Sequence, residues 1–180
     1  MIKASNTTKL VISGVLLAMG MLLPFLTGQI PEIGSRLSPL HLPVLLCGFI
    51  CGWKYGLAVG LVLPLFRSMT FGMPPLMPTA SAMAVEMAVY GAVTGLLYGK
   101  LPKNTASVYI SLVAAMICGR LAWGLASVVL YGAIGNVFTV RMFIAKGFVD
   151  AVPAIIVQLV LIPFIVIAIN RSRVTEAVRA

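Results

Sequence analysis

The sequence predicts an all-α integral membrane protein, a bundle of six transmembrane helices with both termini in the cytoplasm. Hydrophobic residues make up 61% of the 180 positions and the mean hydropathy is +1.09, whereas soluble domains are about 45–50% apolar. The chain has thirteen Lys and Arg but only four Asp and Glu. Because cytoplasmic loops carry the Lys and Arg excess, the positions of these basic residues predict the topology.

Five apolar stretches each approach the ~20 residues that cross a ~30 Å hydrocarbon core as a helix. They cover residues 8–26, 42–66, 78–98, 107–131 and 148–170. Five spans starting from a cytoplasmic N-terminus would place Lys100, Lys103 and the C-terminal arginines outside, against the charge rule. The count of five is therefore rejected.

The stretch 42–66 is better interpreted as two helices, because Lys54 lies at its centre. An unpaired Lys there costs about 2.5–3.5 kcal/mol, so we expect a turn at residues 52–56. Eight basic residues then become cytoplasmic: Lys3, Lys9, Lys54, Lys100, Lys103, Arg171, Arg173 and Arg179. The helices expected within the single domain 1–180 are 8–26, 40–53, 55–68, 78–98, 107–131 and 147–170. Helices two and three, about 13 residues each, reach only about 20 Å.

Several functions are excluded by missing motifs. The run at residues 95–101 has the wrong spacing for a phosphate-binding loop and no Ser or Thr after Lys100, so the chain cannot use ATP alone. His41 is the only histidine, and neither a metalloprotease nor a serine-hydrolase motif occurs. The three cysteines favour packing over metal binding. We expect no catalysis, no cofactor and no metal, and the positive charge reflects membrane topology rather than a nucleic-acid partner.

Small residues recur at the spacing that lets membrane helices approach closely. Gly48, Gly52, Gly56 and Gly60 follow one another every four residues, and we interpret them as packing between the second and third helices. On the first helix, Gly14 and Ala18 form a similar pair, with Ser13 beside them.

The short length, the six apparent spans, the early small-residue pair and the stretch LHLPVLLCGFICGWKYG at residues 40–56 together resemble the substrate-binding S components of energy-coupling factor (ECF) transporters. The resemblance implies a multi-pass protein of the bacterial cell membrane that captures a water-soluble vitamin or precursor from outside. It further implies docking on a transmembrane coupling protein with two ATP-binding cassette ATPases, which alone hydrolyse ATP. The family's first-helix motif, usually Ala-x-x-x-Ala, meets the coupling protein. Gly14 stands here for the first alanine, so the resemblance places the partner interface at Gly14, Ala18 and Ser13.

Charges in the outer half of the predicted bundle form the candidate substrate site. Glu86 lies about 12 Å deep and Arg120 about 10 Å deep, counted at ~1.5 Å per residue, so they can meet. Arg67 and Asp150 border the same level. One interpretation is that Glu86–Arg120 and Arg67–Asp150 are structural ion pairs. The other is that the basic surplus leaves an arginine free to bind a carboxylate in a two-pronged fork.

The surplus favours the second interpretation and an anionic substrate, with pantothenate as the best guess. The predicted substrate-binding residues are Arg36, His41, Arg67, Glu86, Tyr90, Arg120, Trp123, Asn136 and Asp150. Two alternatives stay open. One is a small proton-coupled carrier in which Glu86 or Asp150 titrates, and the other is a non-transport membrane interaction protein.

Overall fold

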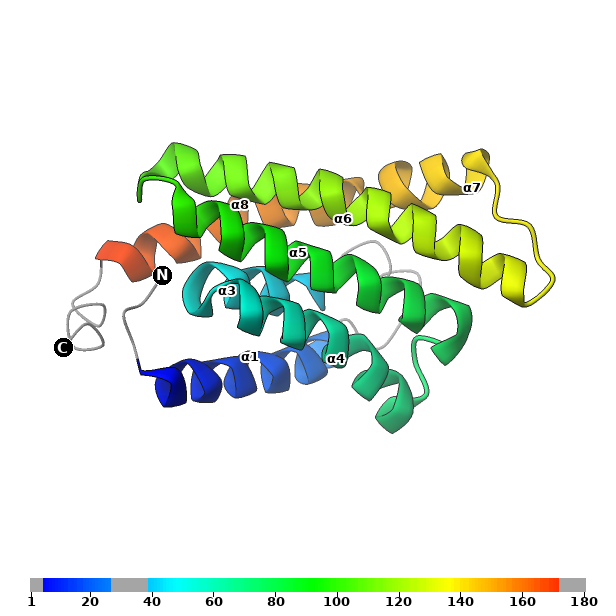
Figure 1. Cartoon of the computed structure of the whole chain (residues 1–180), viewed down its shortest axis with the longest axis horizontal. Helices are drawn as coiled ribbons and strands as arrows, with labels where there is room; N and C mark the ends of the chain where they lie inside the picture. Colours follow the sequence, from blue (N-terminus) through cyan, green and yellow to red (C-terminus); the bar gives the residue numbers. More distant parts are fainter. Residues whose placement is uncertain (1–4, 27–38, 172–180) are drawn as a thin grey trace.

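The computed structural model describes residues 5–26 and 39–171, and nearly all of these lie in helices (Figure 1). The α-helices are α1 (Asn6–Leu26), α3 (His41–Cys51), α4 (Trp53–Phe71), α5 (Ser81–Lys100), α6 (Thr105–Ala133), α7 (Val140–Ile144) and α8 (Val152–Arg171). Two π-helical segments, η1 (Leu76–Ala80) and η2 (Ala145–Val149), precede α5 and α8. Each of the six predicted helices has a counterpart, and the short α7 was not predicted.

Four segments are long and apolar enough to cross a membrane by length and composition: Asn6–Phe25, Leu76–Lys100, Thr105–Ala133 and Val152–Asn170. The apolar α3 has only 11 residues, or about 16 Å at ~1.5 Å per residue. The third helix, expected at residues 55–68, is longer than its apolar run, because α4 has 19 residues. It continues past Arg67 until Gly72, whose left-handed φ of 71° ends the helix.

A break after α3 is present as predicted, but it is limited to Gly52, and residues 53–56 of the predicted turn already belong to α4. α3 ends at Cys51, and α4 begins at Trp53. Gly52 between them has φ 99° and ψ 175°, a conformation that glycine adopts without steric cost. The exposed Lys54 therefore lies in the first turn of α4 rather than in the middle of a span.

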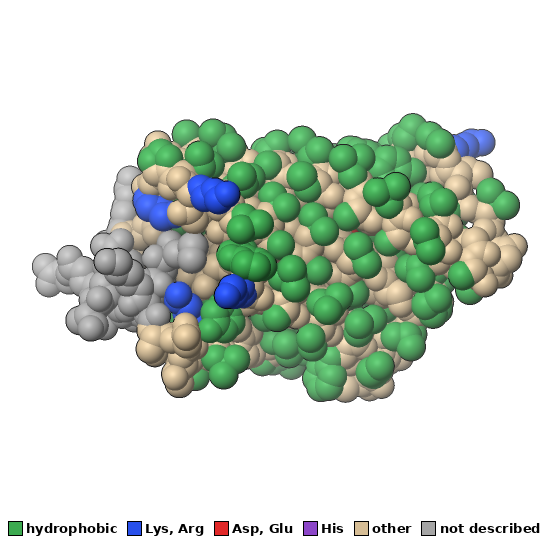
Figure 2. Space-filling view, viewed as in Figure 1, with side chains coloured by type: hydrophobic (Ala, Val, Ile, Leu, Met, Phe, Trp, Pro, Cys, Tyr) green, Lys and Arg blue, Asp and Glu red, His purple; other side chains and the backbone are tan. Residues whose placement is uncertain are grey.

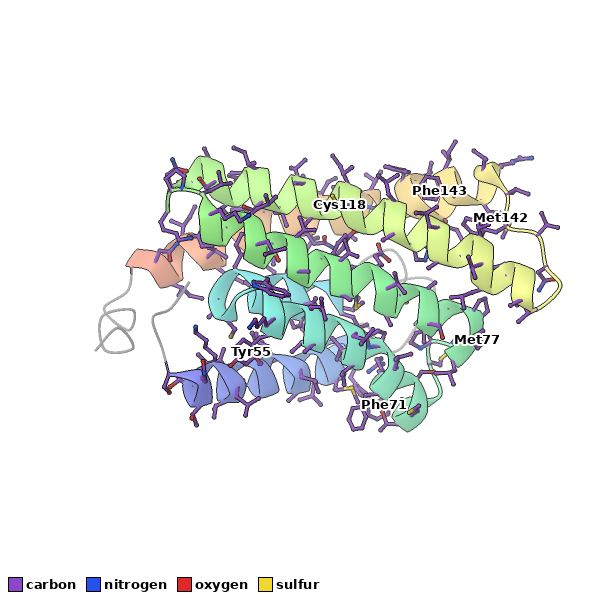
Figure 3. The ribbon with its side chains drawn as sticks, viewed as in Figure 1. Tyr55, Phe71, Met77, Cys118, Met142 and Phe143 are labelled. Carbon is purple, nitrogen blue, oxygen red and sulfur yellow. The ribbon has the colours of Figure 1, made fainter. Side chains whose placement is uncertain are left out.

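Helix α5 is the centre of the bundle. It packs on α3, α4 and α6, while α1 lies against α3 and α4, and α8 lies against α3 and α6 (Figure 1). The Tyr55 hydroxyl donates to the Asn6 carbonyl at 3.3 Å, which ties α4 to the start of α1 (Figure 3). The core at these contacts includes the fully buried Leu45, Leu63 and Met87.

Close approach of α3 and α4 to α5 depends on a set of glycines, which we call the glycine seam. Its members are Gly48, Gly56, Gly60, Gly91 and Gly95. A Cβ at Gly48 or at Gly56 would lie 2.6 Å from the Gly91 carbonyl oxygen. The predicted packing of the second helix on the third is present, since a Cβ at Gly56 would lie 2.9 Å from Gly48 Cα. Both helices also meet α5, whose own glycines were not part of the predicted pattern.

Four lysines of the described residues gather at one end of the bundle. Chain reversals bring Lys9, Lys54, Lys100 and Lys103 to the end at which α1 begins and α8 ends. Figure 2 shows blue side chains gathered at this end and a broad hydrophobic surface along the middle of the molecule.

Lys103 joins this end to the core. Its ammonium group donates to the Tyr98 carbonyl and lies 3.9 Å from the centre of the Tyr98 ring. Partial burial lowers the pKa of Lys103 from its usual value. The Tyr98 hydroxyl in turn accepts a hydrogen bond from Asn170 Nδ2 at 2.8 Å, which connects α5 with α8.

We expect Gly91→Ala to lower the thermal unfolding midpoint of the purified protein. Its new Cβ would meet the backbone of Gly56, and overpacking of this kind costs about 1–3 kcal/mol. Gly132→Ala is the matched control, because a Cβ there meets nothing within 4 Å. Equal unfolding midpoints for the two variants, measured in the same detergent, would contradict this role of the glycine seam.

Candidate functional site

Four polar side chains meet inside the bundle, and we call them the Glu86 cluster: His41 of α3, Glu86 and Tyr90 of α5, and Arg120 of α6. Glu86 Oε1 lies 2.8 Å from Arg120 Nη1, and Glu86 Oε2 lies 3.7 Å from His41 Nε2. The ring centres of His41 and Tyr90 are 5.2 Å apart. Glu86 is only 1% exposed and Arg120 8%, so the ion pair is shielded from solvent.

Local sequence positions these groups. Glu86 and Tyr90 are four residues apart and share one face of α5. Gly119 lies opposite, and a Cβ there would collide with the Tyr90 ring. Because Gly119 has no side chain, α6 lies against this ring, and the next residue, Arg120, reaches Glu86.

Glu86 and Arg120 form an ion pair, but some of their polar atoms have no hydrogen-bond partner. Burying a charge is costly unless it is paired, so Glu86 and Arg120 each require the other in the empty cluster. Within the described part of the chain, however, Arg120 Nε and Glu86 Oε1 of the cluster are buried without a hydrogen-bond partner, and so are Ser127 Oγ and Gln158 Nε2 outside it. Such groups are uncommon in native proteins. Arg120 can therefore form further charge-assisted hydrogen bonds through its Nε edge.

Ser127 and Gln158 were missed by sequence reasoning. Gln158 had a signal, since it is the only polar residue in the apolar run 152–169, and polar groups inside membrane helices are frequently functional. It is 1% exposed and lies on α8, which packs on α3 and α6. Ser127 had a weaker signal: it is seven residues from Arg120 and thus on the same face of α6.

Arg67 lies elsewhere. Its Nη1 donates to the Met21 carbonyl at 2.6 Å, and its guanidinium carbon is 5.5 Å and 5.2 Å from the ring centres of Phe25 and Phe71. Figure 3 shows Phe71 at the end of α4. Asp150 is exposed between η2 and α8. The interpretation of Arg67–Asp150 as an ion pair is wrong, because α1 satisfies this arginine instead.

The remaining predicted residues are not in the Glu86 cluster. Trp123 is half-buried against Phe138 and Phe143, with ring centres 5.5 Å and 6.0 Å away. Asn136 is exposed in the connection between α6 and α7. Arg36 lies outside the described residues. The structure thus brings together His41, Glu86, Tyr90 and Arg120 from the predicted set.

The residues of the predicted partner interface lie on two different sides of α1. Gly14 and Ala18 are exposed, and a Cβ at Gly14 would meet nothing within 4 Å. Ser13 is buried instead. Its hydroxyl donates to the Lys9 carbonyl at 2.7 Å and accepts from Cys47 Sγ at 3.4 Å. Ser13 therefore does not belong to the exposed face, which corrects its assignment to the interface.

A family model described as the ECF transporter substrate-specific component matches residues 8–169. The chain belongs to this family. No individual curated protein and no solved structure matches it. Membership makes it a multi-pass plasma-membrane protein and a substrate-binding transporter subunit rather than an enzyme. It also implies a small-molecule substrate and association with an ECF module of a transmembrane coupling protein and ATPases.

In this S component, we expect Glu86→Gln and Arg120→Met each to destabilise the fold. Removing one partner of a buried ion pair costs about 3–5 kcal/mol, because it leaves the other charge uncompensated. The double variant should recover part of that loss. The exposed Arg141 supplies the control, and Arg141→Met should stay within about 0.5 kcal/mol of the parent. Single variants as stable as the parent in thermal unfolding would show that the pair contributes nothing.

Proposed function

We propose that the S component captures a water-soluble vitamin or vitamin precursor from outside the cell at the Glu86 cluster. It then passes this substrate inward through an ABC-type importer formed with the coupling protein and two ATPases. The observation that supports this site most is a buried arginine that pairs with Glu86 at 2.8 Å and still has an unpartnered Nε. In a substrate-binding subunit, a buried donor with spare capacity suits a polar ligand.

The topology we propose has six spans, including α3 and α4, within one domain of residues 1–180 and with both termini in the cytoplasm. The lysine-rich end, to which Lys54 and Lys100 belong, would face inward. Glu86 then lies in the outer half. It is five residues, or about 7.5 Å, from the start of α5 at Ser81, and fourteen residues, or about 21 Å, from Lys100.

Pantothenate remains the first substrate to test, since it has one carboxylate and a short flexible body. The guanidinium presents one edge to Glu86, and the edge that contains Nε can bind a carboxylate in a fork. Two carboxylates would then share one arginine. The added negative charge needs further donors, and His41 and Tyr90 of the same cluster are the nearest candidates.

A proton-coupled carrier is the second candidate, because Glu86 is a buried carboxylate beside a histidine. The two candidates differ in their energy source. A carrier would accumulate substrate in vesicles under a pH gradient without ATPases, whereas the proposed importer requires its ATPase partners.

We expect the isolated S component to bind its substrate without ATP. Mass spectrometry of the molecule that co-purifies with it would identify the vitamin, and pantothenate should be titrated in parallel. Arg120→Met should weaken binding about 10- to 100-fold, since a hydrogen bond to a charged group contributes about 1.5–3 kcal/mol. Arg120→Lys should restore part of the affinity, and the Glu86→Gln/Arg120→Met double variant should not. Full binding by a folded Arg120→Met protein would remove this residue from the site.

We further expect Gly14→Leu or Ala18→Leu to impair assembly with the coupling protein while substrate affinity stays unchanged. Both positions are exposed beside the apolar Leu10, Val11 and Val15, and bulk at a small-residue pair keeps two helices apart. Gly132→Leu, also at an open position, is the matched control. Normal co-purification of the α1 variants with the coupling protein would place the interface elsewhere.

A further inference from the structure

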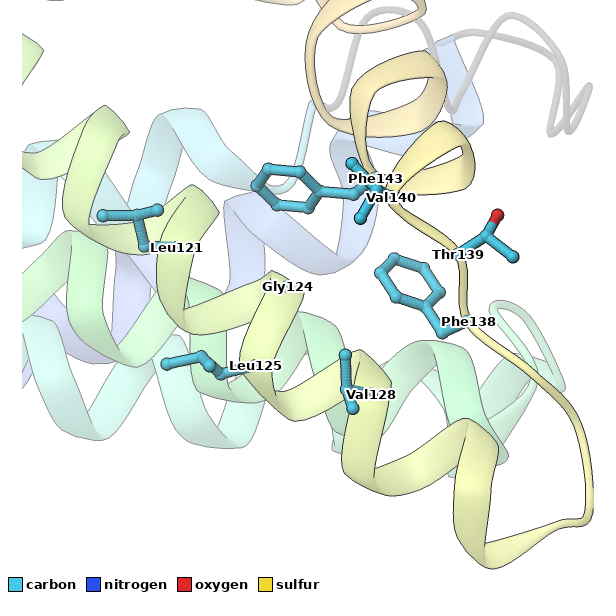
Figure 4. Close-up of a pocket in the computed structure, with 8 residues that line it drawn as sticks. All are labelled: Leu121, Gly124, Leu125, Val128, Phe138, Thr139, Val140 and Phe143. Atoms are coloured by element: carbon cyan, nitrogen blue, oxygen red, sulfur yellow. The ribbon is translucent and has the colours of Figure 1, made fainter.

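We propose that a membrane phospholipid with an anionic headgroup binds in a groove between α6 and α7. The groove has a volume of about 360 Å³. Leu121, Leu125 and Val128 line it along α6, and Phe138, Val140 and Phe143 line the opposite side (Figure 4). We call it the α6–α7 groove. It does not include the Glu86 cluster, so this proposal stands independently of the substrate site.

One wall of the groove is aromatic. Gly124 leaves room on α6 for the Phe143 ring, and a Cβ at Gly124 would lie 2.5 Å from Phe143 Cε2. Trp123 stacks on Phe143 and meets Phe138 edge-on. α7 contributes no buried residue, and beside the packed Phe143 ring an open space remains between α7 and α6.

The lining excludes a water-soluble occupant. Thr139 is its one polar side chain, and its hydroxyl oxygen already accepts a hydrogen bond from the Met142 backbone N–H at 3.3 Å. A polar substrate would lose its hydrogen bonds to water in this groove without replacement. An alkyl chain loses none, and burial of each CH₂ contributes about 0.8 kcal/mol.

The position of the groove suits an acyl chain. Leu121 and Val128 are seven residues apart, so the groove follows α6 for about 10 Å, parallel to a membrane-spanning helix. Leu125 is 73% exposed and Val140 74%, as expected for side chains that face lipid. The exposed Gly14–Ala18 pair is on α1, which packs mainly on α3 and α4, so the groove on α6 and α7 is separate from the proposed coupling-protein interface.

A basic residue adjoins the groove where a headgroup is expected. Arg141 follows the lining residue Val140 and is exposed. Its side chain forms no hydrogen bond or ion pair with the described residues. Lys146, the other exposed base of this region, also forms no ion pair with the described residues, but it lies three residues beyond the last lining residue, Phe143. The uncompensated guanidinium of Arg141 therefore favours a phosphate with net negative charge.

Native mass spectrometry of the full chain from vesicles of equal phosphatidylglycerol and phosphatidylcholine content tests the proposal. We expect the protein to retain phosphatidylglycerol about tenfold more than phosphatidylcholine. Arg141→Gln should remove this preference, and Lys146→Gln should leave most of it. Leu125→Trp, which fills the groove, should reduce retention of both lipids at least fivefold. Ile117→Trp, at an exposed apolar position of α6 outside the groove, should not.

Phosphatidylglycerol with a photoreactive acyl chain provides a second measurement on the unaltered protein. Crosslinks within residues 121–128 or 138–143 support the proposal even if Leu125→Trp fails to fold. Crosslinks spread over all lipid-facing helices would overturn it, as would equal retention by Leu125→Trp and Ile117→Trp. Competition by glycerol phosphate alone would overturn the acyl-chain assignment, and loss of lipid on adding the co-purified vitamin would identify the groove as part of the substrate site.

Discussion

Backbone contact between α4 and α5 is the constraint on which the rest of the bundle depends. In a lipid environment, apolar side chains gain little by leaving their surroundings, so helices associate through close packing and internal hydrogen bonds. The glycine seam brings Gly56 and Gly91 together without intervening side chains. It thereby fixes α5 beside both α3 and α4, and α5 supplies Glu86 and Tyr90 to the interior.

Buried charges in the bundle likewise depend on partners within the protein. Arg67 finds a backbone carbonyl and two aromatic rings, and Arg120 finds a carboxylate. Among the described residues, the two buried arginines both have partners, and the bases without an ion pair in the outer part of the sequence, Arg141 and Lys146, are exposed. An anionic substrate must accordingly bind to an arginine that already has a partner, which makes selectivity depend on geometry as much as on net charge.

Sequence reasoning predicted what depends on position along a helix. The break at Gly52 followed from the cost of a central Lys54, and the meeting of Glu86 with Arg120 followed from equal depths. It failed where a contact depends on the direction in which a side chain points around the helix axis. Depth placed Arg67 level with Asp150, but their side chains have different surroundings, and Ser13 adjoins Gly14 in sequence while facing the opposite side. α7 was missed because five residues are too few for a periodic pattern to emerge.

The contact between Gly119 and the Tyr90 ring restricts which substitutions these two positions tolerate. A methyl group at position 119 cannot coexist with this ring in its present place, so neither residue can change freely while the other is kept. A lineage that exchanged Tyr90 for a small side chain would release position 119, and only afterwards could α6 acquire bulk there. The two positions therefore constrain each other, and the packing of α6 on the Tyr90 ring holds the neighbouring Arg120 beside Glu86.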